Sequence, residues 1–337
     1  MVRKLSLAYA SAYDYDRTRA LLDGTVHPDG IDLNFMVLPT IEETFWRMAR
    51  YQDFGSSEFS LHSYIVSKAD NIDRQLPLTA IPVFPSRMFR HSAIYVNVRA
   101  GIEKPEDLKN KVVGVPEYQI TAATWVRGIL QHEYGVHPED IRKWRTGGLE
   151  QQGRVERLSL NLPKHVHVEP IAESDTLNSM LDRGELDALV TARMPSCFYK
   201  GSSNVRRLFE GYASIEQDYF ERTHIFPIMH TVVIRRDIYE SNSWIARNLY
   251  CAFDEAKALA LDRAYETGAL QFTMPWMIPA IEKQRSVFGE DPWPYGVEAN
   301  IKPLEALTQY SYEQGLSKRR VTIEELFAPE TIGGSRI

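Results

Sequence analysis

Cysteine is scarce in this sequence, and long apolar runs are missing. The 337 residues include two cysteines, Cys197 and Cys251, without the short spacing of a zinc knuckle. Scarce cysteine favours a reducing compartment over a disulfide-stapled fold. No apolar run approaches the roughly 18 residues that span a bilayer, and the first residues show no apolar segment followed by a small-residue cleavage site. We therefore expect a cytoplasmic protein with no membrane partner.

The sequence also lacks long runs of basic residues. The longest run is Lys318-Arg319-Arg320, and the formal net charge is −6. Nucleic-acid binding requires a basic face, so we expect no nucleic-acid partner. His165 and His167 alternate along a strand-like segment, but no nearby cysteine or aspartate completes a metal site. We therefore expect no metal.

Strand-like and helix-like segments alternate over the first hundred residues, as in a sheet with helices packed on it. Thr40 followed by Glu43 has the pattern of a helix N-cap. A second β/α block covers about residues 111–191, and the chain from Trp244 onward is mostly helical. The length suggests two domains.

The second block fits an insertion into the first. We expect lobe one to comprise residues 1–97 and 231–337 and lobe two residues 98–230, with strands 93–96 and 231–234 crossing between them. The predicted class is α/β, a two-lobed periplasmic-binding-protein-like (type II) fold with a ligand cleft between the lobes and a helical C-terminal region. Pockets favour such domain interfaces.

Two stretches place basic side chains directly before an apolar strand. Arg87, Arg90 and His91 precede strand 93–96, and His224 and His230 precede strand 231–234. Arginine matches a carboxylate with a planar fork of donors, and histidine transfers protons near neutral pH. These stretches indicate an anion-binding cleft with proton chemistry. The alternative is that both arginines are solvated loop residues and His91 is structural.

Four segments carry a family resemblance. The chain closely resembles the 4,5-dihydroxyphthalate decarboxylase family from about Tyr13 to Leu316, and the matching motifs are Tyr13-Asp14-Tyr15-Asp16-Arg17-Thr18-Arg19, Met88-Phe89-Arg90-His91-Ser92, Ile225-Phe226-Pro227-Ile228-Met229-His230 and Phe288-Gly289-Glu290-Asp291. The resemblance implies a periplasmic-binding-protein-like fold used as an enzyme. It also implies decarboxylation of 4,5-dihydroxyphthalate to protocatechuate.

That chemistry needs a base at a phenolic hydroxyl and an acid at the carboxyl-bearing carbon. The ring takes up the electrons, so we expect no cofactor. His91 and His230 are the predicted acid and base. Glu58 is a further candidate base, or else a carboxylate stabilised by a helix N-terminus.

The substrate is expected to be a small aromatic carboxylate held by residues that follow the strands. A surface ion pair is the alternative role for Arg193, and a homo-oligomer is possible. The predicted binding residues are Arg87, Arg90, Tyr13, Asp14, Arg17, Ser57, Tyr118, Arg193 and His224.

The alternative function is a non-catalytic solute-binding protein for an aromatic or other small carboxylic acid. Such a receptor needs arginine and aromatic side chains but gains nothing from paired acid–base groups. The several histidines therefore favour the enzyme.

Overall fold

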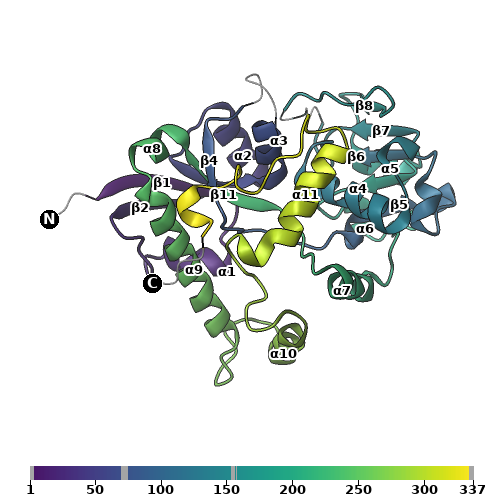
Figure 1. Ribbon diagram of the computed structural model, residues 1–337. Coiled ribbons are helices and arrows are strands. Elements are labelled where there is room, and N and C mark those ends of the chain that lie inside the picture. Colours follow the sequence, from purple (N-terminus) through teal and green to yellow (C-terminus); the bar gives the residue numbers. More distant parts are fainter. Residues whose placement is uncertain (1–3, 70–74, 153–155, 157, 334–337) are drawn as a thin grey trace.

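A computed structural model describes residues 4–69, 75–152, 156 and 158–333. Two sheets form the centres of two lobes that lie side by side (Figure 1). The first sheet has the strand order β2-β1-β3-β11-β4, and the second has the order β10-β5-β9-β6-β7-β8. The mixed α/β architecture agrees with the predicted class.

The first sheet combines parallel strands with one that returns from the other lobe. β1 pairs in parallel with β2 and β3, whereas β11 runs antiparallel between β3 and β4. The strands are β1 Leu5–Ser11, β2 Ile31–Val37, β3 Ser56–Ser60, β4 Leu78–Ile81 and β11 His230–Arg235. The helices are α1 Asp16–Leu22, α2 Ile41–Arg50 and α3 Leu61–Ala69. Thr40 Oγ1 accepts the Glu43 N–H at 3.1 Å, which confirms the predicted N-cap of α2.

The second sheet is built from short strands of three or four residues. Its strands are β5 Ile94–Asn97, β6 Val112–Val115, β7 Lys143–Thr146, β8 Val168–Pro170, β9 Ala188–Val190 and β10 Val205–Arg207. Its helices are α4 Thr121–Tyr134, α5 Leu177–Arg183, α6 Ser196–Tyr199 and α7 Tyr212–Thr223. β6 is parallel to β7 and β9, and β5 is antiparallel to β9 and β10.

The pairing of β5 corrects one predicted boundary. Residues 94–97 were expected to belong to lobe one, but they pair with strands of the second sheet. Ile94 and Val96 are buried in the core of lobe two. The chain therefore leaves the first sheet before Ile94, and we propose a first lobe boundary near residue 93 in place of 97.

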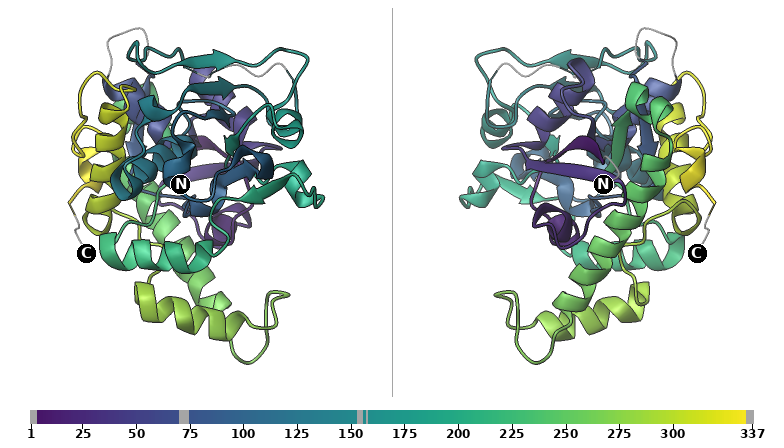
Figure 2. Two further views of the ribbon diagram at one scale, coloured as in Figure 1. Left: turned by 90° about the vertical axis from the view of Figure 1, so that its right-hand side faces the viewer. Right: turned by 90° about the vertical axis from the view of Figure 1, so that its left-hand side faces the viewer.

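The C-terminal region is helical. Its helices are α8 Arg236–Ser241, α9 Trp244–Ala264, α10 Met277–Phe288 and α11 Ile301–Glu313. α9 packs on α1 of the first lobe, and α11 contacts both α3 and α4. α11 thus bridges the lobes, whereas α10 extends away from the body (Figure 2).

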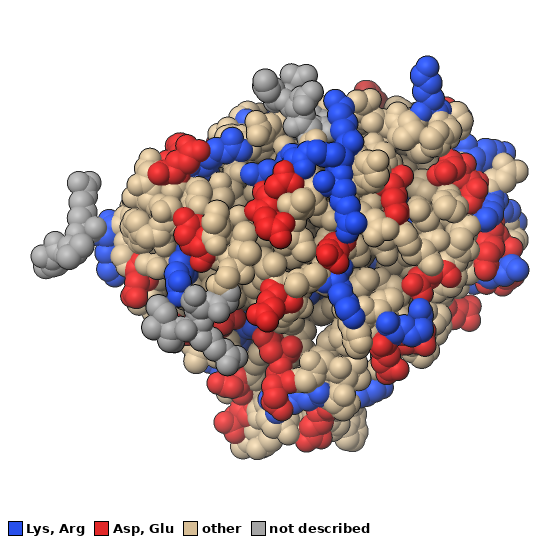
Figure 3. All heavy atoms as spheres, in the orientation of Figure 1, with Lys and Arg blue, Asp and Glu red and all other residues tan. Residues whose placement is uncertain are grey.

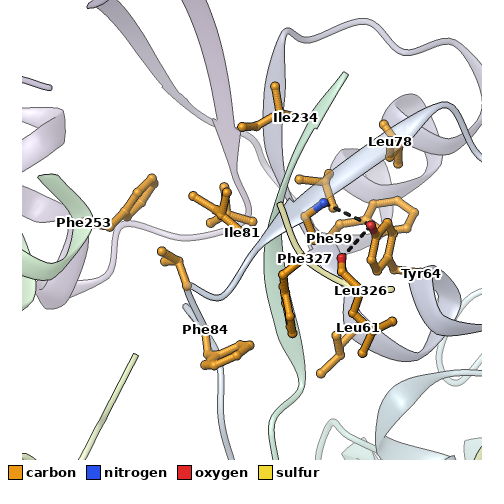
Figure 4. Close-up of a cluster of buried hydrophobic side chains, with 14 of the residues drawn as sticks. Phe59, Leu61, Tyr64, Leu78, Ile81, Phe84, Ile234, Phe253, Leu326 and Phe327 are labelled. Atoms are coloured by element: carbon orange, nitrogen blue, oxygen red, sulfur yellow. Dashed lines mark hydrogen bonds between the residues drawn. The ribbon is translucent and has the colours of Figure 1, made fainter. Parts of the chain in front are cut away.

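The core of the first lobe holds the C-terminal segment in place (Figure 4). The Tyr64 hydroxyl donates to the Leu326 carbonyl at 2.8 Å and accepts the Ala80 N–H at 3.1 Å. Ala80 belongs to β4, and Phe327 lies beside it in parallel. A buried hydroxyl with both bonds made is stable, so this tyrosine ties the end of the chain to the sheet.

Within the described ranges, no helix combines the length and apolarity needed to cross a membrane. Positive and negative side chains are interspersed on the face shown in Figure 3.

Candidate active site

Glu58 and His230 form a buried carboxylate–imidazole pair. Glu58 lies in β3, and His230 opens β11 opposite Ser60. Residues two apart on neighbouring strands share a face of the sheet, so the Glu58 and His230 side chains meet there. The His230 Nδ1 atom lies 2.6 Å from Glu58 Oε1.

The surroundings of Glu58 keep it ionised. Its side chain has no exposed surface. Oε2 accepts the Ala12 N–H at 3.0 Å, and Oε1 accepts the Tyr15 hydroxyl at 2.8 Å. Burial raises the pKa of Glu58, but the charge of His230 in its protonated form, its hydrogen bond, and the bonds from Ala12 and Tyr15 hold the pKa below its ordinary value. Burial, followed by the charge of Glu58, raises the pKa of Tyr15, which therefore remains a neutral donor.

The Glu58 charge fixes the tautomer of His230. An ionised carboxylate only accepts hydrogen bonds, so the neutral form of the imidazole carries its one proton on Nδ1. The hydrogen bond of the ring to a described residue is made by Nδ1 and not by the opposite nitrogen, Nε2, and the side chain keeps 11% of its surface exposed. The Phe45 ring packs edge-on against the imidazole at 4.8 Å and limits its rotation. In the neutral form of His230 the pair therefore presents an oriented proton acceptor at Nε2.

This pair lies next to the contact between the lobes. Ser60, the strand partner of His230, bonds Thr121 through their hydroxyls at 2.9 Å. Thr121 is the first residue of α4 in lobe two. Two residues after Ser60, His62 Nδ1 lies 2.6 Å from the Gln119 carbonyl. The imidazole of His230 is therefore placed beside the seam where a ligand of a two-lobed fold is expected.

Arg17 contributes a cation beside the pair. Its guanidinium stacks on Tyr15 at 4.2 Å and on Trp293 at 4.3 Å from the ring centroids. Its Nε donates to the Pro85 carbonyl at 2.6 Å. Because Tyr15 also bonds Glu58, this contact brings the predicted residue Arg17 close to the pair.

Arg90 is buried against weak acceptors. Its Nε lies 3.2 Å from the sulfur of Met229, and its Nη1 lies 3.7 Å from that of Met88. Burial lowers its pKa to about 10, although the charge of Glu216 opposes the shift. In the described part of the chain no carboxylate forms an ion pair with it. A buried guanidinium bonded only to sulfur has donors left for an anion.

Arg87 is committed to the scaffold. Its guanidinium donates to the carbonyls of Phe226 at 3.3 Å and Pro294 at 2.6 Å, and also to the side-chain oxygen of Asn300. Burial lowers its pKa to about 9. These bonds join the segment before β5 to the C-terminal region and occupy donors that would otherwise face a substrate.

His91 lies apart from the pair. Its ring packs edge-on against Phe209 at 5.4 Å and Tyr219 at 5.3 Å. Neither ring nitrogen bonds a described residue, and Nδ1 is 4.0 Å from Glu216 Oε1. Burial, aided by Arg222, lowers the pKa of His91 to about 4. A histidine in this state is neutral at pH 7 and lacks the imidazolium proton that a general acid would donate.

Three predicted residues in lobe one lie away from the acceptor nitrogen. Asp14 pairs with Arg19. Tyr13 is exposed and packs edge-on against Tyr15 at 5.6 Å. Ser57 is buried, and strand alternation places its side chain on the face of β3 opposite Glu58.

The predicted residues of lobe two have separate roles. Tyr118 is buried, with Arg127 over its ring at 3.8 Å. Arg193 forms an ion pair with Glu42 at 2.7 Å, which is the alternative role considered for it. His224 is exposed and ends α7.

Tyr15 is the residue that the predicted site lacked. The signal was present, because Tyr15 lies within the Tyr13–Arg19 motif directly after a strand. Its partner Glu58 is 43 residues away, so only the pairing of β1 with β3 reveals the bond. Across the described residues, no group of three or more His, Cys, Asp or Glu side chains is placed to hold a metal ion.

Two curated relatives carry the same name. The chain is 41% identical over 334 residues to "4,5-dihydroxyphthalate decarboxylase" of Comamonas testosteroni, with 99% of both chains covered. It is 44% identical over 220 residues to the protein of that name from Pseudomonas putida, covering 65% of this chain and 83% of the relative. A scan against models of protein families finds no match.

Solved structures share the fold at low identity. The periplasmic aliphatic sulphonate binding protein SsuA from Escherichia coli matches with a TM-score of 0.54 and 14% identity, covering 97% of this chain and 98% of the other. The alkanesulfonate-binding protein SsuA from Xanthomonas axonopodis pv. citri bound to MOPS matches with a TM-score of 0.50 and 13% identity, covering 97% of each chain. These matches show a periplasmic-binding-protein-like fold. The curated relatives decide the family: this chain belongs to the 4,5-dihydroxyphthalate decarboxylases, which by name are carboxy-lyases.

Proposed function

We propose that this chain converts 4,5-dihydroxyphthalate to protocatechuate and carbon dioxide. The names of its relatives support the reaction. The observation that carries it is the Glu58–His230 pair, which presents an oriented proton acceptor beside the contact between the lobes.

In the proposed reaction, His230 Nε2 takes the proton of the hydroxyl para to the departing carboxylate. The phenolate electrons move through the ring to the carbon that carries this carboxylate, and that carbon is protonated. The carbon–carbon bond then breaks, its electron pair restores the aromatic ring, and carbon dioxide leaves. Because Glu58 is ionised, it stabilises the imidazolium that forms.

The hydroxyl and the protonated carbon lie on opposite sides of the ring, so one imidazole does not reach both. A second donor on the far side must supply the carbon's proton. The lowered pKa of His91 argues against that residue. Glu58, whose oxygens are occupied by bonds within the protein, acts in this scheme as a positioning residue and not as the base.

Arg17 and Arg90 are the proposed cations for the retained carboxylate. Arg17 is held beside the pair through Tyr15, and Arg90 has only sulfur acceptors. Because the ring takes up the electron pair, the proposal includes no cofactor. A cytoplasmic location also belongs to this proposal.

The test is an incubation of purified, EDTA-treated protein with 4,5-dihydroxyphthalate, with protocatechuate followed by chromatography. We expect turnover by the wild type and a rate loss on the order of 10²-fold or more in His230→Gln. His132→Gln is a matched control, since His132 also bonds a glutamate, Glu313, at 2.7 Å.

Two outcomes would contradict the proposal. Tight binding of the diacid without turnover would point to a solute-binding protein. If His230→Gln turned over at the wild-type rate, His230 would not be the base, although the chain would still catalyse the reaction.

A further inference from the structure

Residues 265–288, which we call the arm, project from the body of the molecule. They comprise the loop after α9 and the whole of α10, and Figure 2 shows them extending below both lobes. None of the residues of α10 is fully buried. An isolated helix of this length is marginal in water, so the arm is short of packing partners within one chain.

The end of the arm is apolar. Leu270, Phe272, Met274 and Trp276 are 50%, 38%, 57% and 80% exposed. We call these four residues the tip patch. Scattered apolar residues are ordinary on a protein surface, but four large exposed ones within seven positions concentrate apolar surface on one short segment.

The charges around the tip patch argue against a lipid surface as its partner. Residues 267–281 contain no charged side chain. Residues 262–291 contain three basic and five acidic residues. Anionic membranes attract amphipathic segments with basic flanks, whereas these flanks are acidic overall.

We propose that the tip patch is an interface with a second copy of this chain. A two-fold contact places one patch against itself, so an uncharged patch is self-complementary, whereas two patches of one sign would repel. The exposed parts of these four side chains amount to about 500 Å² on one arm. Two opposed arms bury about 1,000 Å², which is where specific interfaces begin.

The base of the arm reaches the segment that carries Arg87. The Phe288 ring lies 4.3 Å from that of Phe220 and 5.6 Å from that of Phe226, and Arg87 bonds the Phe226 carbonyl. An arm held by a partner therefore also steadies the segment that precedes Arg90 and His91. The interface does not depend on the proposed reaction.

The test is the mass of the wild-type protein in solution at micromolar concentration, by light scattering and sedimentation equilibrium. We expect a dimer or a larger assembly built on dimers. Trp276→Glu should break the contact between tip patches and reduce the mass to half or less. Met274→Lys should weaken the same contact. Both side chains are exposed, so both variants should fold, which circular dichroism checks.

Tyr199→Glu is the matched control. Tyr199 is also 80% exposed but lies on α6, outside the arm. We expect it to keep the wild-type mass. A monomeric wild type, or an unchanged mass in Trp276→Glu, would overturn the proposal. So would a monomer that floats with phospholipid vesicles through Trp276, because that result assigns the patch to a membrane.

Discussion

At the scale of single residues, the position of one proton on the neutral His230 ring decides whether Nε2 can accept a proton from the substrate. In Glu58→Gln the side-chain amide can donate to Nδ1 and favour the tautomer with its proton on Nε2. We expect kcat to fall by about 10²–10⁴-fold with little change in KM, because orientation and proton transfer are lost and binding is not. Initial-rate kinetics on the diacid measure both constants.

Glu313→Gln controls for the loss of a His–Glu bond as such. Glu313 bonds His132 at 2.7 Å on the outside of α4 and α11. Its rates should match the wild type. Equal losses in the two variants, or wild-type kcat in Glu58→Gln, would contradict the tautomer argument.

The hydroxyl of Tyr15 should govern how Glu58 contributes to stability with pH. A carboxylate whose folded pKa is below the ordinary 4.5 stabilises the fold above that pH, and the contribution disappears as the pH falls through the folded value. Tyr15→Phe removes one hydrogen-bond donor to Glu58, so the pKa of Glu58 in the folded variant lies closer to 4.5. We expect a loss of about 1–3 kcal/mol at pH 7 that shrinks as the pH falls below 4.5.

Urea unfolding at pH 7 and in the acid range measures this difference. Tyr239→Phe is the control, since Tyr239 bonds Glu330 at 2.8 Å on an exposed surface. Tyr239→Phe should lower the free energy of unfolding only slightly at either pH. A Tyr15→Phe deficit that stays constant with pH would show that packing, and not the Glu58 charge, is responsible.

Residue types alone identified Glu58, His230, Arg17 and Arg90 as candidates but not their roles. The hydrogen bond between Glu58 and His230 joins residues 172 apart, which only the register of β3 and β11 brings together. Arg87 and Arg90 look alike in the sequence. The acceptors that separate them, carbonyls for one and sulfurs for the other, come from distant segments.

At the scale of elements, α4 and α11 approach closely at Gly128. A Cβ atom there would overlap the ring of Tyr310. That ring is buried and packs against Trp125 at 5.6 Å and His132 at 4.9 Å, so it has little room to move. We expect Gly128→Ala to destabilise the fold by about 1–3 kcal/mol, although alanine by itself favours a helix by about 1 kcal/mol.

Thermal unfolding of Gly128→Ala and Gly211→Ala makes the comparison. Gly211 precedes α7, and the nearest atom to an added Cβ there is 3.7 Å away. Its melting temperature should be unchanged or slightly raised. A stabilised Gly128→Ala would show that the two helices separate at low cost.

Elements with local signals were predictable from the sequence. The Thr40 cap of α2 acts within a few residues, and it occurs as expected. The lobe boundary was predicted at residue 97, whereas β5, which ends at that residue, pairs in the second sheet. The apolar residues of β5 indicate burial but do not specify which of two cores they enter, and pairing with β9 decides it.

At the scale of the molecule, Arg193 and Glu42 link the two lobes. Arg193 follows β9 in lobe two, and Glu42 lies in the first turn of α2 in lobe one. We expect Arg193→Ala to raise KM by up to about 5-fold with kcat nearly unchanged, because a half-exposed pair contributes little. The difference from wild type should fade at high salt.

Arg183→Ala is the intralobe control. Arg183 pairs with Asp175 at 2.7 Å with similar exposure, but both residues belong to lobe two. Its KM should stay at the wild-type value. Equal effects in both variants, or an Arg193→Ala effect that persists in high salt, would contradict a contact that favours lobe closure.

The two-lobed architecture was predictable because β/α alternation and a family resemblance extend over nearly the whole chain. The contact between the lobes was not. Arg193 and Glu42 are 151 residues apart, and each has the local sequence of an ordinary surface charge.

The long separation between Glu58 and His230 has a consequence for how the protein is made. Glu58 emerges from the ribosome 172 residues before the His230 imidazole that forms a hydrogen bond with it. At 5–20 residues per second this takes roughly 10–30 s. β11 is also the strand that joins β3 to β4. During synthesis, the first lobe therefore has an incomplete sheet, and Glu58 lacks its bond to His230, until the inserted lobe has been made. The last strand of the sheet and its histidine arrive together, so this pair can assemble only once the inserted lobe has emerged.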